Sequence, residues 1–147
     1  MTAAATDDGD TVAILNGSTP VTSGSNASWS VGDNTLTITV TDKDDETNTT
    51  EYTVTVHRNS NACAITAFVI GEAEGVIDES EHTIAVEVPN GTGLTALSPV
   101  VTVSTGASVS PVSGTEGDFT DPVTYTVTAE DGTTTQAYTV TVTEASA

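Results

Sequence analysis

Apolar residues alternate with threonines in the stretch 123–142, VTYTVTAEDGTTTQAYTVTV, on both sides of a turn at 130–132. Alternation at every second position places one set of side chains on each face of a strand. The pattern therefore predicts a β-hairpin with one apolar face and one hydroxylated face. The apolar positions are Val123, Tyr125, Val127, Tyr138, Val140 and Val142.

The same pattern occurs earlier, in the stretch 36–56, LTITVTDKDDETNTTEYTVTV. An acidic turn at 42–46 replaces the turn of the later copy. Two copies of one hairpin in 147 residues predict two small modules of the same kind. We expect the hairpins to superimpose, with Tyr52 and Tyr138 both buried. The apolar positions of the earlier copy are Leu36, Ile38, Val40, Tyr52, Val54 and Val56.

Shorter runs extend the prediction of strands to the rest of the chain, because threonine and valine are abundant and apolar residues do not recur at helical spacing. Before the first hairpin we expect the end of a strand at 2–6, an acidic turn at 7–10 and a strand at 11–15. Trp29 begins a further short strand, where the alternation favours a core position over a sugar-stacking platform. In the second half, strands are predicted within 62–70, 82–89, 94–103 and 106–111.

The runs VAILNGSTPVTSG at 12–24, VGDNTLTITVTDKDD at 31–45 and YTVTV at 52–56 resemble the C-terminal part of cadherin-like β-sandwich repeats of bacterial surface proteins. Those repeats are similar to immunoglobulin domains and start with two further strands. Neither strand precedes Thr2 in this sequence. The resemblance therefore implies that the first module lacks its opening strands.

The segments AITAF, HTIAVEVP, LSPVVTV, GASVSPVSG, DFTDPVTYTVTAEDGT and YTVTV follow one another within 62–143. Their order resembles an uncharacterised β-sandwich module of secreted and lipid-anchored bacterial proteins. This resemblance implies an immunoglobulin-like sandwich at an extracellular, cell-surface location and supplies no catalytic residues. We predict an all-β fold with two tandem immunoglobulin-like β-sandwich modules, at 1–58 and 62–147, joined by a linker at 59–61.

The charge of the chain limits its partners. The chain has 21 acidic residues but only one Lys and one Arg, which gives a formal net charge of −19. Such a chain repels phosphate backbones and anionic membrane surfaces, so nucleic acid is excluded as a partner. No apolar run approaches the ~20 residues that span a bilayer, so membrane insertion is not expected. The single Cys63 is either a small buried apolar residue or a thiol for an intermolecular bridge.

The acidic turn of the first hairpin is the candidate metal site. Asp42, Asp44 and Asp45 offer carboxylate oxygens within one turn, and Ca²⁺ binds clustered oxygen ligands of irregular geometry. No complete calcium-binding motif is present, so the alternative is a solvated turn. We expect calcium or no cofactor at all.

The sequence contains no group of residues whose spacing indicates a catalytic site, so we do not expect an enzyme. His57 and His82 lie in different predicted modules, and paired carboxylates occur only in turns, where solvent keeps their protonation ordinary. The predicted function is a non-catalytic extracellular structural module, such as a spacer, adhesin stalk or filament subunit, whose partners are other copies of the chain or neighbouring surface modules. The alternative is an accessory module that binds glycan for a polysaccharide-active protein. A sandwich that lacks opening strands would also accept a strand from a neighbour, either 62–70 or 138–143, and assemble head to tail.

Overall fold

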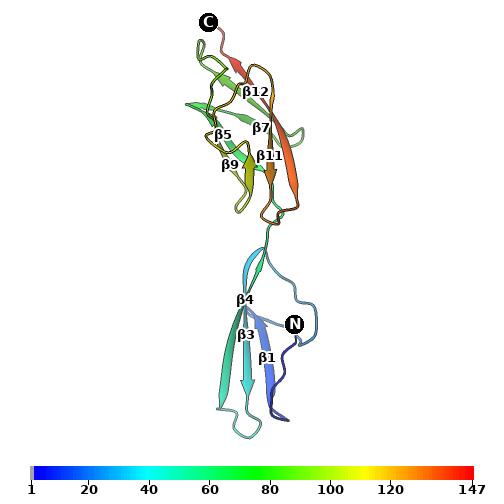
Figure 1. Ribbon diagram of the computed structural model, residues 1–147. Coiled ribbons are helices and arrows are strands. Elements are labelled where there is room, and N and C mark those ends of the chain that lie inside the picture. The colour runs from blue at the N-terminus through cyan, green and yellow to red at the C-terminus, as the bar shows by residue number, and fades with distance from the viewer. Residues whose placement is uncertain (1) are drawn as a thin grey trace. The chain divides into compact units, whose positions relative to one another are not determined.

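The computed structural model describes residues 2–147, which form twelve β-strands and no helix (Figure 1). The predicted all-β class is confirmed. Among these residues, none belongs to a helix that is long and apolar enough to cross a membrane. The chain divides into two compact units, Met1–Asn59 (unit 1) and Ser60–Ala147 (unit 2), which are described separately. Whether the two units are repeats of one module stays a prediction.

Unit 1 contains a single antiparallel sheet with the strand order β2-β1-β3-β4 (Figure 1). The register of β3 and β4 runs without interruption from Gly32 opposite Arg58 to Thr41 opposite Thr49. Even-numbered residues share one face, which we call the apolar face, and threonines dominate the other face. The strands are β1 (Thr11–Asn16), β2 (Thr19–Pro20), β3 (Gly32–Thr41) and β4 (Thr49–Arg58). The hydrophobic residues of the apolar face are Val12, Ile14, Leu36, Ile38, Val40, Tyr52, Val54 and Val56.

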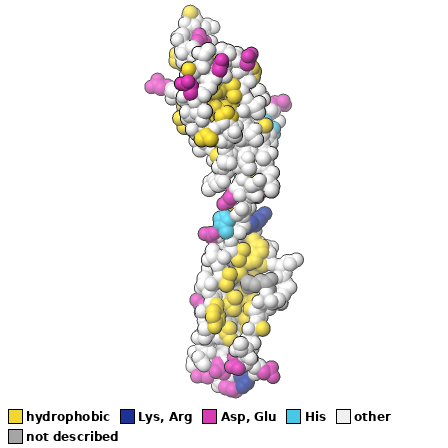
Figure 2. All heavy atoms as spheres, in the orientation of Figure 1, with side chains coloured by type: hydrophobic (Ala, Val, Ile, Leu, Met, Phe, Trp, Pro, Cys, Tyr) yellow, Lys and Arg dark blue, Asp and Glu magenta, His cyan; other side chains and the backbone are white. Residues whose placement is uncertain are grey.

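The apolar face of unit 1 is covered only in part. Leu36 is fully buried, but Tyr52 is 56% exposed and Val54 is 37% exposed. Figure 2 shows the hydrophobic side chains of unit 1 as a continuous band on the viewed face. The prediction that Tyr52 is buried is therefore wrong. The physical reason is that no second sheet packs over the face within the described part of unit 1.

Two short strands predicted in unit 1 are absent. Residues 2–6 and 29–31 have irregular backbone instead. Residues 2–6 instead border a hollow on the apolar face together with Val12, Ile38, Val40 and Tyr52. The prediction that Trp29 belongs to a core strand is also wrong. Its side chain is half-buried on the loop that connects β2 to β3.

Unit 2 is a β-sandwich. A five-stranded sheet with the order β10-β11-β12-β8-β7 faces a three-stranded sheet with the order β6-β5-β9 across a shared core. β12 pairs with β8 in parallel, whereas the other pairs of strands are antiparallel. The strands are β5 (Ile65–Ile70), β6 (Ala73–Glu74), β7 (Val76–Asp78), β8 (Thr83–Val88), β9 (Val100–Val103), β10 (Ser108–Ser110), β11 (Val123–Thr128) and β12 (Thr135–Glu144).

Aromatic side chains fill the core of unit 2. Phe68 of β5 contacts Tyr125 of β11 edge to face, with ring centroids 5.2 Å apart. Tyr138 of β12 is 1% exposed, so the prediction that it is buried is confirmed. Its hydroxyl donates a hydrogen bond of 2.7 Å to Glu79 Oε2. Burial, assisted by Glu79, raises the pKa of Tyr138 to about 12. The hydroxyl is therefore held as a proton donor, which satisfies the polar end of a buried ring.

Candidate functional site

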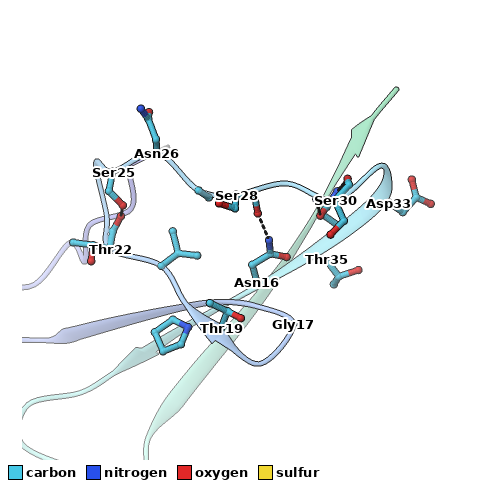
Figure 3. A pocket seen from close by; sticks show the side chains of 14 residues that line it. Asn16, Gly17, Thr19, Thr22, Ser25, Asn26, Ser28, Ser30, Asp33 and Thr35 are labelled. Carbon is cyan, nitrogen blue, oxygen red and sulfur yellow. Dashed lines mark hydrogen bonds between the residues drawn. The ribbon is translucent and has the colours of Figure 1, made fainter. Parts of the chain in front are cut away.

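Unit 1 contains a polar groove with a volume of about 700 Å³. It lies between the loop 17–31 and the adjoining ends of β1 and β3 (Figure 3). Hydroxyl and amide side chains provide most of its lining. Groups of this kind orient bound ligands through hydrogen bonds. The polar side chains at the groove include Asn16, Thr19, Ser25, Asn26, Ser28 and Asp33.

Two asparagines fix the loop to the sheet. Asn16 Nδ2 donates a hydrogen bond of 3.1 Å to the Ser28 carbonyl, the contact drawn in Figure 3. Asn34 is buried, accepts a hydrogen bond of 2.9 Å from Ser30 N, and donates one of 2.8 Å back to the Ser30 carbonyl. Because a buried amide needs such partners, these bonds hold one wall of the groove in place. Figure 3 shows the side chain of Asn26, an exposed residue, directed away from the Asn16 contact.

Asn16 and Asn34 are not among the site residues predicted from the sequence. A signal for them was present, because both occupy even-numbered positions on strands whose other even-numbered residues are apolar. A polar residue that interrupts an apolar alternation requires a buried hydrogen-bond partner. Here that partner is the backbone of the loop.

Trp29 lies beside the groove, in a second hollow of about 310 Å³ lined also by Val21, Ser25, Asn26 and Ala27. The irregular backbone that replaces the predicted strand leaves Trp29 half-buried. The Arg58 guanidinium donates a hydrogen bond of 3.1 Å to the Trp29 carbonyl and fixes this part of the loop to the end of β4. A half-buried tryptophan on a fixed loop, next to amide and hydroxyl groups, combines an apolar surface with hydrogen-bonding partners.

The hairpin between β3 and β4 contains the predicted calcium ligands Asp42, Asp44 and Asp45. Asp42 accepts hydrogen bonds from Asp44 N at 2.8 Å and from Asn48 Nδ2 at 3.2 Å. Asp45 accepts bonds from Thr47 Oγ1 at 2.6 Å and from Thr47 N at 3.0 Å. The bond from Asp44 N, assisted by Asn48, lowers the pKa of Asp42, and the Thr47 hydroxyl and N–H lower that of Asp45. Both carboxylates thus serve the turn itself.

Asp44 is the third predicted ligand, and it forms an exposed ion pair with Lys43. Across residues 2–147, no group of three or more His, Cys, Asp or Glu side chains is arranged to hold a metal ion. Calcium binding and a solvated turn therefore both stay predictions for this hairpin.

Unit 2 buries all of its aromatic side chains. Phe68, Phe119, Tyr125 and Tyr138 are each 2% exposed or less. The two histidines named in the sequence analysis lie in separate units. His57 of unit 1 contacts Asp33 Oδ1 at 2.6 Å. His82 of unit 2 packs edge to face on Tyr138.

Two family models cover most of the chain. Residues 65–142 match the model described as SGBP, N-terminal, in which SGBP stands for surface glycan-binding protein. The matched segment makes up more than half of the 147 residues. The chain belongs to the SGBP N-terminal family. The sandwich of unit 2 is the SGBP N-terminal domain, which the sequence analysis had compared with an uncharacterised module. Residues 1–59 match the cadherin-like beta sandwich domain, so the predicted resemblance of the first module is confirmed.

A solved structure also resembles this SGBP-family chain. It is a crystal structure from Bacteroides thetaiotaomicron of a protein described as a candidate glycoside hydrolase, with 30% sequence identity and a TM-score of 0.54. The similarity covers 63% of this chain and 28% of that protein. This chain therefore corresponds to less than a third of the length of its structural relative. None of the curated proteins matches the chain.

Proposed function

We propose that this chain is a non-catalytic extracellular part of a bacterial surface protein that handles polysaccharide, and that unit 2 is a spacer within it. The observation that carries the proposal is the burial of every aromatic side chain in unit 2. Sugar rings stack on exposed aromatic surfaces, and this sandwich presents none. The families matched by both units are typically extracellular or on the cell surface, which supports the location.

The surface of unit 2 suits a spacer. Residues 60–147 contain 12 of the 21 acidic residues and neither of the two basic ones. Charge of a single sign keeps the sandwich hydrated and disfavours non-specific contact with similar neighbours. The exposed positions of β12 are largely threonines. We therefore assign unit 2 the role of holding other parts of the protein apart.

A second candidate function is glycan binding in unit 1. Trp29 favours it, because this half-buried residue lines a hollow next to the polar groove. In this arrangement the indole would stack on a sugar ring, while Asn26 and the neighbouring hydroxyl groups would form hydrogen bonds with the sugar hydroxyls. The printed family name, surface glycan-binding protein, supports the class of ligand.

Affinity gel electrophoresis of the full chain in gels that contain soluble polysaccharides tests both functions. A spacer without a glycan site migrates equally in all gels. Retardation that is lost in Trp29→Ala but kept in Tyr52→Ala would establish the groove as a glycan site. Tyr52→Ala is the matched control, because Tyr52 is the exposed aromatic residue of the apolar face. Retardation that survives both substitutions would contradict the assignment of unit 2 as a spacer.

The non-catalytic part of the proposal has its own test. The chain is incubated with the same polysaccharides, and released reducing ends are measured over a day. We expect no release above the level of a heat-denatured sample. Release that depends on folded protein would refute the proposal.

A further inference from the structure

The edges of the sheets differ greatly in length. Among the described residues, five of the six edge strands, β2, β6, β7, β9 and β10, have four residues or fewer. The sixth, β4, has ten residues. Soluble proteins usually shorten their edge strands, because a long free edge pairs with strands of other molecules. β4 is thus the exception in this molecule.

β4 also lacks most of the features that protect an edge, and its charged side chains are Glu51 and Arg58. Its sequence TTEYTVTVHR contains no proline, glycine or lysine, and its register with β3 has no bulge. Opposite residues of β3 and β4 alternate between pairs that exchange backbone hydrogen bonds and pairs that do not. The hydrogen bond from Asp42 N to the Asn48 carbonyl shows that the even-numbered pairs are the bonded ones. Even-numbered residues of β4 therefore bond to β3, and odd-numbered residues direct their backbone N–H and C=O groups outward. The outward residues are Thr49, Glu51, Thr53, Thr55 and His57.

We propose that β4 is an interface through which two copies of this chain pair in antiparallel orientation, with Val54 on the two-fold axis. In this register Tyr52 of one copy lies opposite Val56 of the other, and Val54 lies opposite itself. The exposed parts of Tyr52 and Val54 thereby gain an apolar neighbour. On the opposite face, Glu51 lies opposite His57 of the other copy, whose imidazole contacts Asp33 Oδ1 within its own chain.

The negative charge of the chain does not oppose this pairing. The acidic hairpin 42–48 lies beyond Thr49, five residues from Val54. At about 3.4 Å per residue, each hairpin lies about 17 Å from the axis, and the two hairpins lie about 34 Å apart on opposite sides. This separation exceeds the screening length of about 8 Å at physiological ionic strength.

The structure also explains why a second copy pairs through β4 and not through the segments considered in the sequence analysis. Phe68 in the segment 62–70 and Tyr138 in the segment 138–143 are each 1% exposed in the core of unit 2. Either segment would have to leave that core to reach a neighbour. Pairing of β4 needs no such opening, and its two-fold symmetry closes the assembly at two copies.

Sedimentation velocity of the full chain over a wide concentration range tests the pairing. A single shared strand edge is a small interface, so we expect a reversible dimer with a dissociation constant of about 10–1,000 μM. Val54→Lys brings two ammonium groups together at the axis and should weaken dimerisation at least tenfold. Ala13→Lys makes the same charge change on β1, at an exposed position away from the edge, and should leave it unchanged. A wild-type chain that is monomeric at every concentration would overturn the proposal.

Disulfide cross-linking tests the register, in a Cys63→Ser background that removes the natural thiol. In Val54→Cys the two introduced residues are directly opposite, with Cα atoms about 4.5 Å apart, which suits a disulfide. In Val56→Cys they are about 14 Å apart, beyond its reach. We expect covalent dimer from Val54→Cys only, with circular dichroism confirming that both variants fold. Cross-linking of Val56→Cys, or of neither variant, would overturn the proposed pairing. Both experiments are independent of glycan binding.

Discussion

Asp131 stabilises the turn between β11 and β12. Its carboxylate accepts hydrogen bonds from Thr134 Oγ1 at 2.7 Å and from the N–H groups of Thr133 and Thr134 at 2.8 Å. These bonds, led by that of the Thr134 hydroxyl, lower the pKa of Asp131 from 3.8 to about 2. Because the folded pKa lies below the unfolded one, the stabilisation is complete above about pH 4 and is lost as the pH falls towards 2.

We predict that Asp131→Ala lowers the melting temperature of unit 2 at pH 7, and that its difference from the wild type shrinks between pH 4 and pH 2. Differential scanning calorimetry of the full chain at a series of pH values measures this. Glu87→Gln, which removes a charge from an exposed position of β8, should have little effect at either pH. A difference for Asp131→Ala that stays constant down to pH 2 would contradict the role of the carboxylate.

Tyr52 and Tyr138 occupy equivalent places in the two hairpins but differ in burial, with 56% and 1% exposure. Tyr138→Ala should reduce the free energy of unfolding of unit 2 by about 3–5 kcal/mol, as expected for a buried aromatic ring. Tyr52→Ala should change the free energy of unfolding of unit 1 by less than about 1 kcal/mol. Urea unfolding followed by circular dichroism compares the two variants. Equal losses would mean that the apolar face of unit 1 is covered in solution.

At the scale of elements, the strands of both hairpins could be predicted because alternation depends only on neighbours along the chain. The burial of their apolar faces could not, because it depends on a second sheet. The face that carries Tyr138 meets β5 and β9, whereas the face that carries Tyr52 meets no such sheet within unit 1. The segment that contains Trp29 was misassigned because serines at 28 and 30 imitate a strand pattern. Its real conformation depends on side-chain hydrogen bonds to the loop backbone from Asn16, which lies on another strand, and from Asn34, which follows the loop.

The hairpin between β3 and β4 gives a prediction about calcium. Asp42 and Asp45 already accept hydrogen bonds from their own turn, and Ca²⁺ would have to replace several of them. We therefore expect millimolar CaCl₂ to leave the melting temperature of unit 1 unchanged when ionic strength is held constant with NaCl. A rise that Asp42→Asn abolishes would show instead that the hairpin binds calcium.

At the scale of the whole molecule, the two units differ in the size of their cores. Of the buried hydrophobic residues in the described chain, Ile14 and Leu36 belong to unit 1 and fifteen belong to unit 2. Because stability rises with buried apolar area, unit 1 should unfold first. We predict two thermal transitions. Fluorescence of Trp29, the only tryptophan, should follow the lower one, while circular dichroism follows both. A single transition seen by both probes would contradict independent unfolding.

At the scale of the whole molecule, only some features could be predicted from the sequence. The all-β class and the surface-protein resemblance followed from alternation and from the order of short motifs, both of which are local. The groove could not be predicted, because it forms where the loop 17–31 meets the ends of two strands. The position of β4 at the edge of its sheet depends on strand order, which the sequence pattern alone does not determine.

The positions of the two basic residues determine how a digestive protease acts on the molecule. Trypsin cleaves after Lys and Arg, and this chain offers only Lys43, at the tip of a hairpin, and Arg58, at the end of β4. Cleavage after Arg58 separates the chain almost at the boundary between the units. Residues 60–147 contain no tryptic site, so trypsin spares them whether they are folded or not. Exposure to trypsin should therefore remove the cadherin-like unit and leave the SGBP N-terminal unit whole.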